Sequence, residues 1–241
     1  MRLNSYKNVL CLFLFIGLVK LSQAQDFSEV FQKVNNYYKT TNYYNIETTY
    51  TMYRGYTGKI ITESYKGHMY KKKEVTGVTI LGSEIITFPE GQITITDKSK
   101  SIIYINREKI ALKNSIIDTH KLTKFYKQIA FKEDDNIAQY QFLLKNEVKN
   151  LPYNKLVFYI NKSDNSILKQ ELFFTSKLPF TNKKGEREYD FGRMVIVYKV
   201  SNKLHKNSIK IEDYLIIDSN NKVSLTKAYK DYQLINQTPS N

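Results

Sequence analysis

The sequence predicts a mainly β protein with α-helices, of the α+β class, in which an antiparallel curved sheet forms an unclosed β-barrel. An N-terminal helix and a mid-chain lid helix are expected to lie against this sheet. Three observations predict this fold. Strand-like segments are separated by turn signals roughly every 8–12 residues, two stretches show helical periodicity, and strands do not alternate with long helices as in a parallel sheet.

The first 24 residues have the pattern of a secretory signal peptide. A short basic region precedes an apolar run at residues 9–19, about half of the roughly 20 apolar residues that a membrane-spanning helix needs. Ser22 and Ala24 then place small residues at positions −3 and −1 of a cleavage site. We therefore expect a signal peptide at 1–24 with cleavage after Ala24. The mature chain, 25–241, is expected to be a single half-barrel domain that is periplasmic or secreted.

Residues 26–40 are expected to form an amphipathic helix. Asp26, followed three residues later by Glu29, resembles a capping box. Apolar side chains recur with a helical period of about 3.6 residues, and they are Phe27, Val30, Phe31, Val34, Tyr37 and Tyr38. This stripe must lie on an apolar surface elsewhere in the protein.

The next segment has the pattern of successive strands. Residues 42–54 are rich in Tyr and Thr, and strand alternation places Tyr44, Ile46, Tyr50 and Met52 on one face. Further strands are expected at 59–72, 75–81, 84–88, 92–96 and 101–106. Glycine- and proline-containing turns separate them, which favours an antiparallel meander.

Residues 114–133 interrupt the strands with a second amphipathic pattern. Leu122, Phe125, Tyr126 and Ile129 have helical spacing. We expect a helix here that covers the sheet as a lid.

Strands then resume toward the C-terminus. They are expected at 136–145, 154–161, 166–175 and 193–200, with closing strands at 214–218 and 229–235. Residues 176–190 are polar and are expected to form a loop.

Several of these strands are apolar on both faces. They include 102–105, 156–160, 172–174 and 195–197. An antiparallel sheet with one face in water normally alternates apolar and polar residues, so both faces must be partly covered. Either the protein has an ordinary closed core, or a concave face roofed by helices holds an apolar ligand.

The charge of the chain favours anionic partners. It carries 37 Lys and Arg against 23 Asp and Glu, a net charge of +14, so peripheral contact with an anionic membrane is one expectation. The basic residues are scattered and lie in no recognition helix or RNA-binding motif. We therefore expect no nucleic acid partner.

Few residues in the sequence support catalysis. The three histidines, His68, His120 and His205, lie far apart and lack metal-ligand spacing. Cys11, the only cysteine, lies in the segment expected to be removed. A glycosidase needs two converging carboxylates, and the strands offer only Glu47, Glu63 and Glu171. We therefore expect a protein that is not an enzyme, with no catalytic residues, metal or cofactor.

The order of elements resembles the periplasmic lipoprotein carriers (Lol-type) of the Gram-negative envelope. The likeness rests on the export signal, the helix, the meander, the mid-chain helix and the second set of strands, with local similarity in the long strand after Gly58 and the two-strand unit at 154–175. The resemblance implies a half β-barrel with a helical lid over a cavity for acyl chains. It also implies that a buried arginine holds the lid, and Arg54 is the only arginine in the first long strand.

The resulting expectation is a non-enzymatic envelope protein that binds a lipid or a lipidated protein in an apolar cavity. The expected lining residues are Tyr44, Ile46, Tyr50, Met52, Phe158, Met194 and Ile196, under the lid residues Leu122, Phe125 and Ile129. The alternative is a protein–protein interaction module of the envelope with the same fold. The 20 tyrosines of the chain favour this alternative, because tyrosine is enriched at interfaces.

Overall fold

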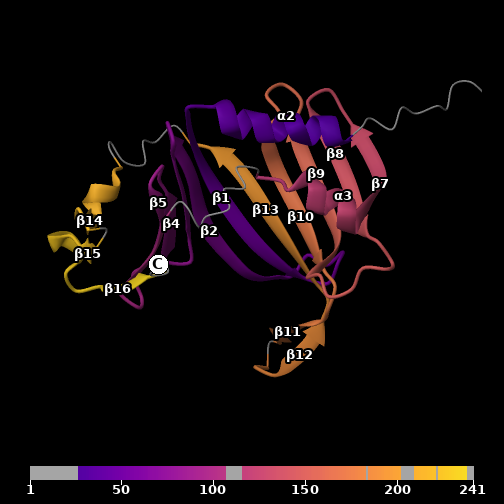
Figure 1. Cartoon of the computed structure of the whole chain (residues 1–241). Helices are drawn as coiled ribbons and strands as arrows, with labels where there is room; N and C mark the ends of the chain where they lie inside the picture. Colours follow the sequence, from indigo (N-terminus) through magenta and orange to yellow (C-terminus); the bar gives the residue numbers. More distant parts are fainter. Residues whose placement is uncertain (1–26, 107–115, 183, 202–208, 221, 238–241) are drawn as a thin grey trace, which may run out of the picture.

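The computed structural model describes residues 27–106, 116–182, 184–201, 209–220 and 222–237 (Figure 1). The expected signal peptide at 1–24, its cleavage site and His205 lie outside these residues. The described part consists of one large curved sheet, two α-helices and two small hairpins. The predicted α+β fold with an unclosed antiparallel sheet is confirmed.

Twelve strands form the main sheet in the order β16-β6-β5-β4-β3-β2-β1-β13-β10-β9-β8-β7. Their bounds are β1 Tyr43–Arg54, β2 Ile61–Lys72, β3 Val75–Ile80, β4 Ser83–Thr87, β5 Gly91–Thr96, β6 Ser101–Asn106, β7 Tyr126–Glu133, β8 Ile137–Leu144, β9 Tyr153–Asn161, β10 Ile167–Phe174, β13 Gly192–Val200 and β16 Gln233–Asn236. β16 pairs with β6 in parallel. β16 and β7 stand at the two ends of the order and do not pair with each other, so the sheet described here stays open.

The remaining elements lie outside the main sheet. They are the helices α2 Phe27–Thr40 and α3 Thr119–Phe125, the hairpin of β11 Leu178–Thr181 with β12 Arg187–Asp190, the hairpin of β14 Leu215–Ile217 with β15 Val223–Leu225, and the 3₁₀ turns η3 Ile211–Asp213 and η4 Lys227–Tyr229. Neither α-helix among the described residues is long and apolar enough to cross a membrane.

β1 joins the two halves of the sheet. It pairs with its sequence neighbour β2 on one side and with the distant β13 on the other. In this register Tyr50 lies opposite both Tyr65 of β2 and Ile196 of β13. Ile196 in turn lies opposite Gln170 of β10, and Gln170 lies opposite Phe158 of β9. Directly opposed residues share a face, and we call this face of the sheet the cavity face.

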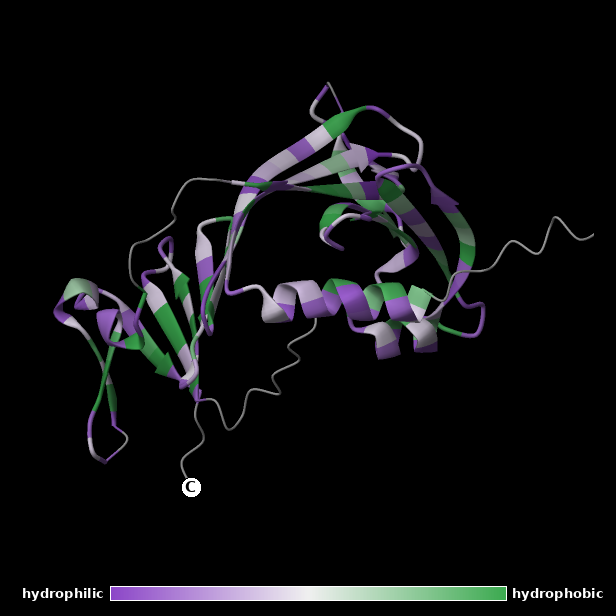
Figure 2. Ribbon diagram, turned by 90° about the horizontal axis from the view of Figure 1, so that it is seen from above, coloured by the Kyte–Doolittle hydropathy of each residue, from purple (hydrophilic) through white to green (hydrophobic). Residues whose placement is uncertain are grey.

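A first core covers the cavity face from β1 to β8. Its buried strand residues are Tyr44, Ile46, Ala138, Tyr140, Phe142, Leu156, Phe158, Ile160 and Ile167. α2 supplies the residues that pack on them, and Figure 2 shows this helix lying across the open side of the curved sheet. Phe31 of α2 is fully buried, and its ring centroid lies 5.5 Å from that of Tyr140 and 5.1 Å from that of Phe158. The predicted amphipathic helix is therefore confirmed, and its apolar stripe faces the sheet.

A second core covers the opposite face, which we call the outer face, from β3 to β6. The register aligns Gly77, Ile86, Ile93 and Tyr104 across these four strands. The C-terminal segment packs on this row through Ile211, Tyr214 and Leu215, with Tyr229, Tyr232 and Leu234 partly buried beside them. The two cores therefore lie on opposite faces and on different strands of one sheet.

The change of face occurs between β2 and β3. Tyr70 of β2 points to the outer face, opposite Gly77, and is 3% exposed. A Cβ atom on Gly77 would overlap the Tyr70 ring, and the Tyr70 hydroxyl lies 2.9 Å from Glu84 Oε1. Glycine at this position lets the aromatic ring lie flat on the neighbouring strand.

The mid-chain helix is shorter than predicted. The helix at 114–133 was expected to include Ile129, but α3 ends at Phe125 and residues 126–133 form β7. Leu122 and Phe125 belong to the helix, whereas Ile129 lies in β7 with 46% of its surface exposed. β8 needs a hydrogen-bonding partner along this edge, and pairing with β8 outweighs the helical spacing of residues 126–129.

Two further expectations at the C-terminal end need correction. Residues 176–190 were expected to be a loop, yet β11 and β12 form a hairpin there. Residues 214–218 were expected to close the main sheet, yet β14 pairs only with β15. In both places short segments pair with each other, which the sequence does not distinguish from a loop or from a strand of the larger sheet.

Candidate ligand-binding cavity

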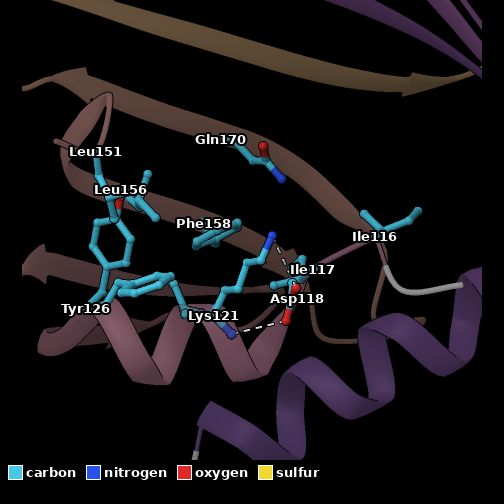
Figure 3. Close-up of a pocket in the computed structure, with 11 residues that line it drawn as sticks. Ile116, Ile117, Asp118, Lys121, Tyr126, Leu151, Leu156, Phe158 and Gln170 are labelled. Atoms are coloured by element: carbon cyan, nitrogen blue, oxygen red, sulfur yellow. Dashed lines mark hydrogen bonds and ion pairs between the residues drawn. The ribbon is translucent and has the colours of Figure 1, made fainter. Parts of the chain in front are cut away.

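A cavity of about 560 Å³ lies between α3 and the cavity face of the sheet. This volume falls within the range of about 300–1,000 Å³ that is usual for small-molecule sites. Figure 3 shows the residues around it. They are Ile116, Ile117, Asp118, Lys121, Leu122, Phe125, Tyr126, Leu151, Leu156, Phe158 and Gln170.

The floor of the cavity comes from two neighbouring strands. Leu156 and Phe158 are two residues apart on β9, so their side chains share the cavity face. Gln170 of β10 lies opposite Phe158 and supplies the only amide side chain among the lining residues. Phe158 also contacts Phe31 of α2, with ring centroids 5.1 Å apart. Because α2 packs on the same face of the sheet, it holds the floor beside the cavity.

The roof is formed by α3 and the three residues before it. Asp118 is the N-cap, and its Oδ1 accepts a hydrogen bond of 3.0 Å from the Lys121 backbone N–H. Leu122 is buried and points to the floor side, while Phe125 is partly buried at the other end. A helix of seven residues is not stable alone in water, so contacts with its neighbours must hold it in place.

Two polar side chains from outside hold this roof at its two ends. The Asn35 amide of α2 donates to Ile117 O at 2.8 Å and accepts from Ile117 N at 3.0 Å. At the other end, Lys145 Nζ donates to the carbonyls of Thr123 at 2.8 Å and Lys124 at 3.1 Å. These carbonyls are at the C-terminus of the helix, where a cation is favourable. The first residue couples α2 to the cavity roof, and the second couples α3 to the end of β8.

Replacing Asn35 by alanine is expected to loosen the roof. The Ile117 N–H and C=O would both lose their partner, which costs about 1–2 kcal/mol. We expect the backbone amide of Ile117 to exchange with solvent about tenfold faster, measured by hydrogen–deuterium exchange. Asn36→Ala is the control, because Asn36 is exposed on the same helix. Equal protection of Ile117 in both variants would contradict the coupling.

Charged groups lie at the edge of the cavity. Lys121 Nζ is 3.9 Å from Asp118 Oδ2. Lys124 Nζ lies 5.3 Å from the ring centroid of the lining residue Phe125. At the far end the Tyr126 hydroxyl donates to Tyr153 O at 2.9 Å. Burial raises the pKa of Tyr126 above its ordinary value, so this phenol stays protonated at neutral pH.

The structure brings the predicted strand residues to one face but only one of them to this cavity. Tyr50 opposes Ile196 and Met52 opposes Met194 on the cavity face. Tyr44 and Ile46 share that face and are buried in the first core with α2. Phe158 lines the cavity. That these seven residues bind a ligand stays a prediction.

The predicted lid residues divide in the same way. Leu122 and Phe125 line the cavity, while Ile129 lies in β7 and is exposed. The sequence reasoning missed the remaining lining residues, which are Ile116, Ile117, Asp118, Lys121, Tyr126, Leu151, Leu156 and Gln170. Leu156 could have been found, because it is two residues before Phe158 in the same strand.

Arg54 does not hold the lid. Its Nη2 lies 2.6 Å from Glu188 Oε2 and its Nε lies 3.1 Å from Asp190 Oδ2, both in β12. Hydrogen bonds from Asn182 and Arg54 lower the pKa of Glu188, and the hydrogen bond from Arg54 lowers the pKa of Asp190. Figure 1 shows this hairpin at the end of the sheet away from α2. The expected role of Arg54 is therefore wrong, and its partners belong to an additional hairpin.

The three strand carboxylates that the sequence offered do not share one face of the sheet. Glu63 lies opposite Met52 on the cavity face, whereas Glu47 and Glu171 alternate to the outer face. Asp118 is the only carboxylate among the lining residues, and it caps α3. Within the described ranges, no group of three or more His, Cys, Asp or Glu residues could hold a metal ion.

Comparisons with known proteins give matches only among solved structures. No protein-family model and no curated protein matches the sequence. An uncharacterized conserved protein from Thermus thermophilus is similar with a TM-score of 0.43 and 11% identity, over 88% of this chain and 100% of that one. A LolA superfamily protein from Nitrosomonas europaea has a TM-score of 0.31 and 12% identity, over 71% and 90%.

A third similar structure is the Pseudomonas aeruginosa MucA/MucB complex. The matching chain has a TM-score of 0.39 and 9% identity, over 78% of this chain and 62% of that one. The similar structures thus include the superfamily that the order of elements resembles. At these identities the likeness concerns the fold.

Proposed function

We propose that this chain is an exported, non-enzymatic binding protein of the cell envelope that holds a lipid or an acylated ligand in its half-barrel. The observation that carries the proposal is the cavity of about 560 Å³ between α3 and the sheet. Its walls are mainly Leu, Ile and Phe side chains, with few polar groups. Such a site favours an apolar chain, because burying apolar surface is worth about 25 cal/mol per Å². The signal-peptide pattern at 1–24 supports export.

Filling the cavity is expected to weaken binding of an acyl probe. Leu151 lines the cavity and is only partly buried, so Leu151→Trp places a large ring in the space with little disturbance of the first core. We expect the Kd for 11-(dansylamino)undecanoic acid to rise about tenfold or more, measured by fluorescence titration.

Val197→Trp is the matched control for this experiment. Val197 lies on the outer face of β13 with 43% of its surface exposed, away from the cavity. The control variant is expected to bind like the wild type. Equal affinity in both tryptophan variants, or no binding of the probe by the wild type, would overturn the proposal.

A second candidate function is docking of an envelope protein. It is supported by the exposed side chains of Ile60 and Ile61, 66% and 56% of whose surfaces face solvent next to Gly58. Exposed apolar residues that gather in one place mark interaction sites. The test is the double substitution Ile60→Ser and Ile61→Ser. If it removes capture of a partner protein while binding of the acyl probe is unchanged, the chain has the docking function in addition to ligand binding.

A further inference from the structure

The cavity is polar at one end and apolar at the other. Figure 3 shows Gln170, Asp118 and Lys121 around one half, together with Ile116 and Ile117, and Leu151, Leu156 and Tyr126 around the other. A ligand without a polar group would place only apolar atoms against the polar side chains of the first half. This difference in polarity between the two halves fits an amphiphile that binds in a single orientation.

α3 supplies the cation at the polar end. The helix sequence Thr-His-Lys-Leu-Thr-Lys-Phe contains two lysines and no acid. The Asp118 carboxylate is engaged by the backbone N–H of Lys121 at 3.0 Å. By contrast, the Lys121 side chain is 62% exposed, and its ammonium is 3.9 Å from Asp118. This is a long, weak pair that leaves N–H donors for a further partner.

A neighbouring amide adds to this site. Within the described residues, the Gln170 side chain makes no hydrogen bond, and its amide can donate to a ligand oxygen. The polar end therefore offers cationic and neutral donors.

We propose that the ligand of this cavity is an anionic amphiphile. Its acyl chain would lie along Leu151, Leu156 and Phe158, and its negatively charged head group would lie against Lys121 and Gln170. This inference rests on the proposed function and narrows it to one ligand class. Lys121 is then a specificity-determining residue, because it separates anionic from zwitterionic head groups of the same chain length.

The experiment compares two lipids that differ in head-group charge. 1-Myristoyl-lysophosphatidylglycerol and 1-myristoyl-lysophosphatidylcholine are titrated separately into the protein, below their micelle concentrations, by isothermal titration calorimetry at low salt. The wild type is expected to bind the anionic lipid about fivefold more tightly, as one charge pair near the surface allows. Raising the salt concentration is expected to reduce this preference.

Variants of Lys121 test the assignment. In Lys121→Gln the ratio of the affinities for the anionic and the zwitterionic lipid is expected to be close to one. In Lys121→Glu the preference is expected to reverse. Because Lys121 is mostly exposed, both variants should fold as the wild type does. Lys98→Gln, in the exposed turn between β5 and β6, removes the same charge far from the cavity and is expected to keep the preference.

The outcomes separate this inference from the proposed function. Equal binding of both lipids by the wild type would overturn the head-group assignment and leave the acyl-binding cavity in place. A preference that survives Lys121→Gln would also overturn it. Binding of neither lipid, together with no binding of the dansyl probe, would overturn the proposed function itself.

Discussion

Replacing Phe31 by alanine is expected to lower the free energy of unfolding by about 3–5 kcal/mol, the usual loss for a buried phenylalanine. Phe31 is fully buried, and its ring contacts those of Tyr140, Phe142 and Phe158 at centroid distances of 5.5, 5.7 and 5.1 Å. Removing it takes away the most buried aromatic contact of α2 with the sheet, including its contact with Phe158 of the cavity floor. Chemical denaturation followed by circular dichroism measures the change.

The neighbouring residue provides the control for this variant. Gln32 is exposed on the same helix, and Gln32→Ala is expected to change stability by less than about 0.5 kcal/mol. A loss below about 1 kcal/mol for Phe31→Ala would show that α2 does not form part of the cooperative core. In that case the cavity floor would have to be held by the strands alone.

Replacing Gly77 by alanine is expected to cost about 3 kcal/mol, at the upper end of the range for overpacked sites. The new methyl group would occupy the place of the Tyr70 ring. The ring must then leave its buried position on β3 and give up the contact of its hydroxyl with Glu84. Thermal unfolding and urea titration both report this loss.

A double-mutant cycle separates this effect from a general loss of strand stability. In the Tyr70→Ala background the space above Gly77 is free, so Gly77→Ala is expected to cost little there. The coupling energy between the two sites should be about 1–3 kcal/mol. Additive effects of the two substitutions would show that the ring does not depend on the glycine.

Periodicity alone was sufficient to predict α2 and most strands. The six apolar residues of α2 repeat through the whole helix, and the structure places them on the sheet. In β1 the alternation of Tyr44, Ile46, Tyr50 and Met52 correctly grouped these residues on one face. Regular patterns longer than ten residues contain enough repeats to identify both the element and its inner side.

The pairing of distant strands could not be predicted in the same way. β1 lies beside β13, more than a hundred residues later, and this contact joins the two halves of the main sheet. Strands such as β9 are apolar on both faces, so their sequences do not identify an inner side. The helix predicted over residues 126–129 was wrong. Four residues at helical spacing are also compatible with a strand, and here the edge of β8 needs a pairing partner.

The cavity was predictable only in part for a related reason. Leu122, Phe125 and Phe158 lie in regular elements, and the sequence indicated them. Ile116, Ile117 and Leu151 lie in connecting segments, where no period exists and position depends on contacts such as that between Asn35 and Ile117. Gln170 depends on the register between β9 and β10, which the sequence of either strand does not contain.

The change of core face between β2 and β3 divides the selective constraints on this protein into two sets. Under the proposed function, residues of α2, α3 and the cavity face from β1 to β8 must satisfy the ligand as well as the fold. Residues of the C-terminal segment and the outer face from β3 to β6 must satisfy only each other. The two sets meet at Tyr70 and Gly77. Ligand preference can therefore diverge among relatives while the second core stays the same. The second core can equally change while ligand preference is kept.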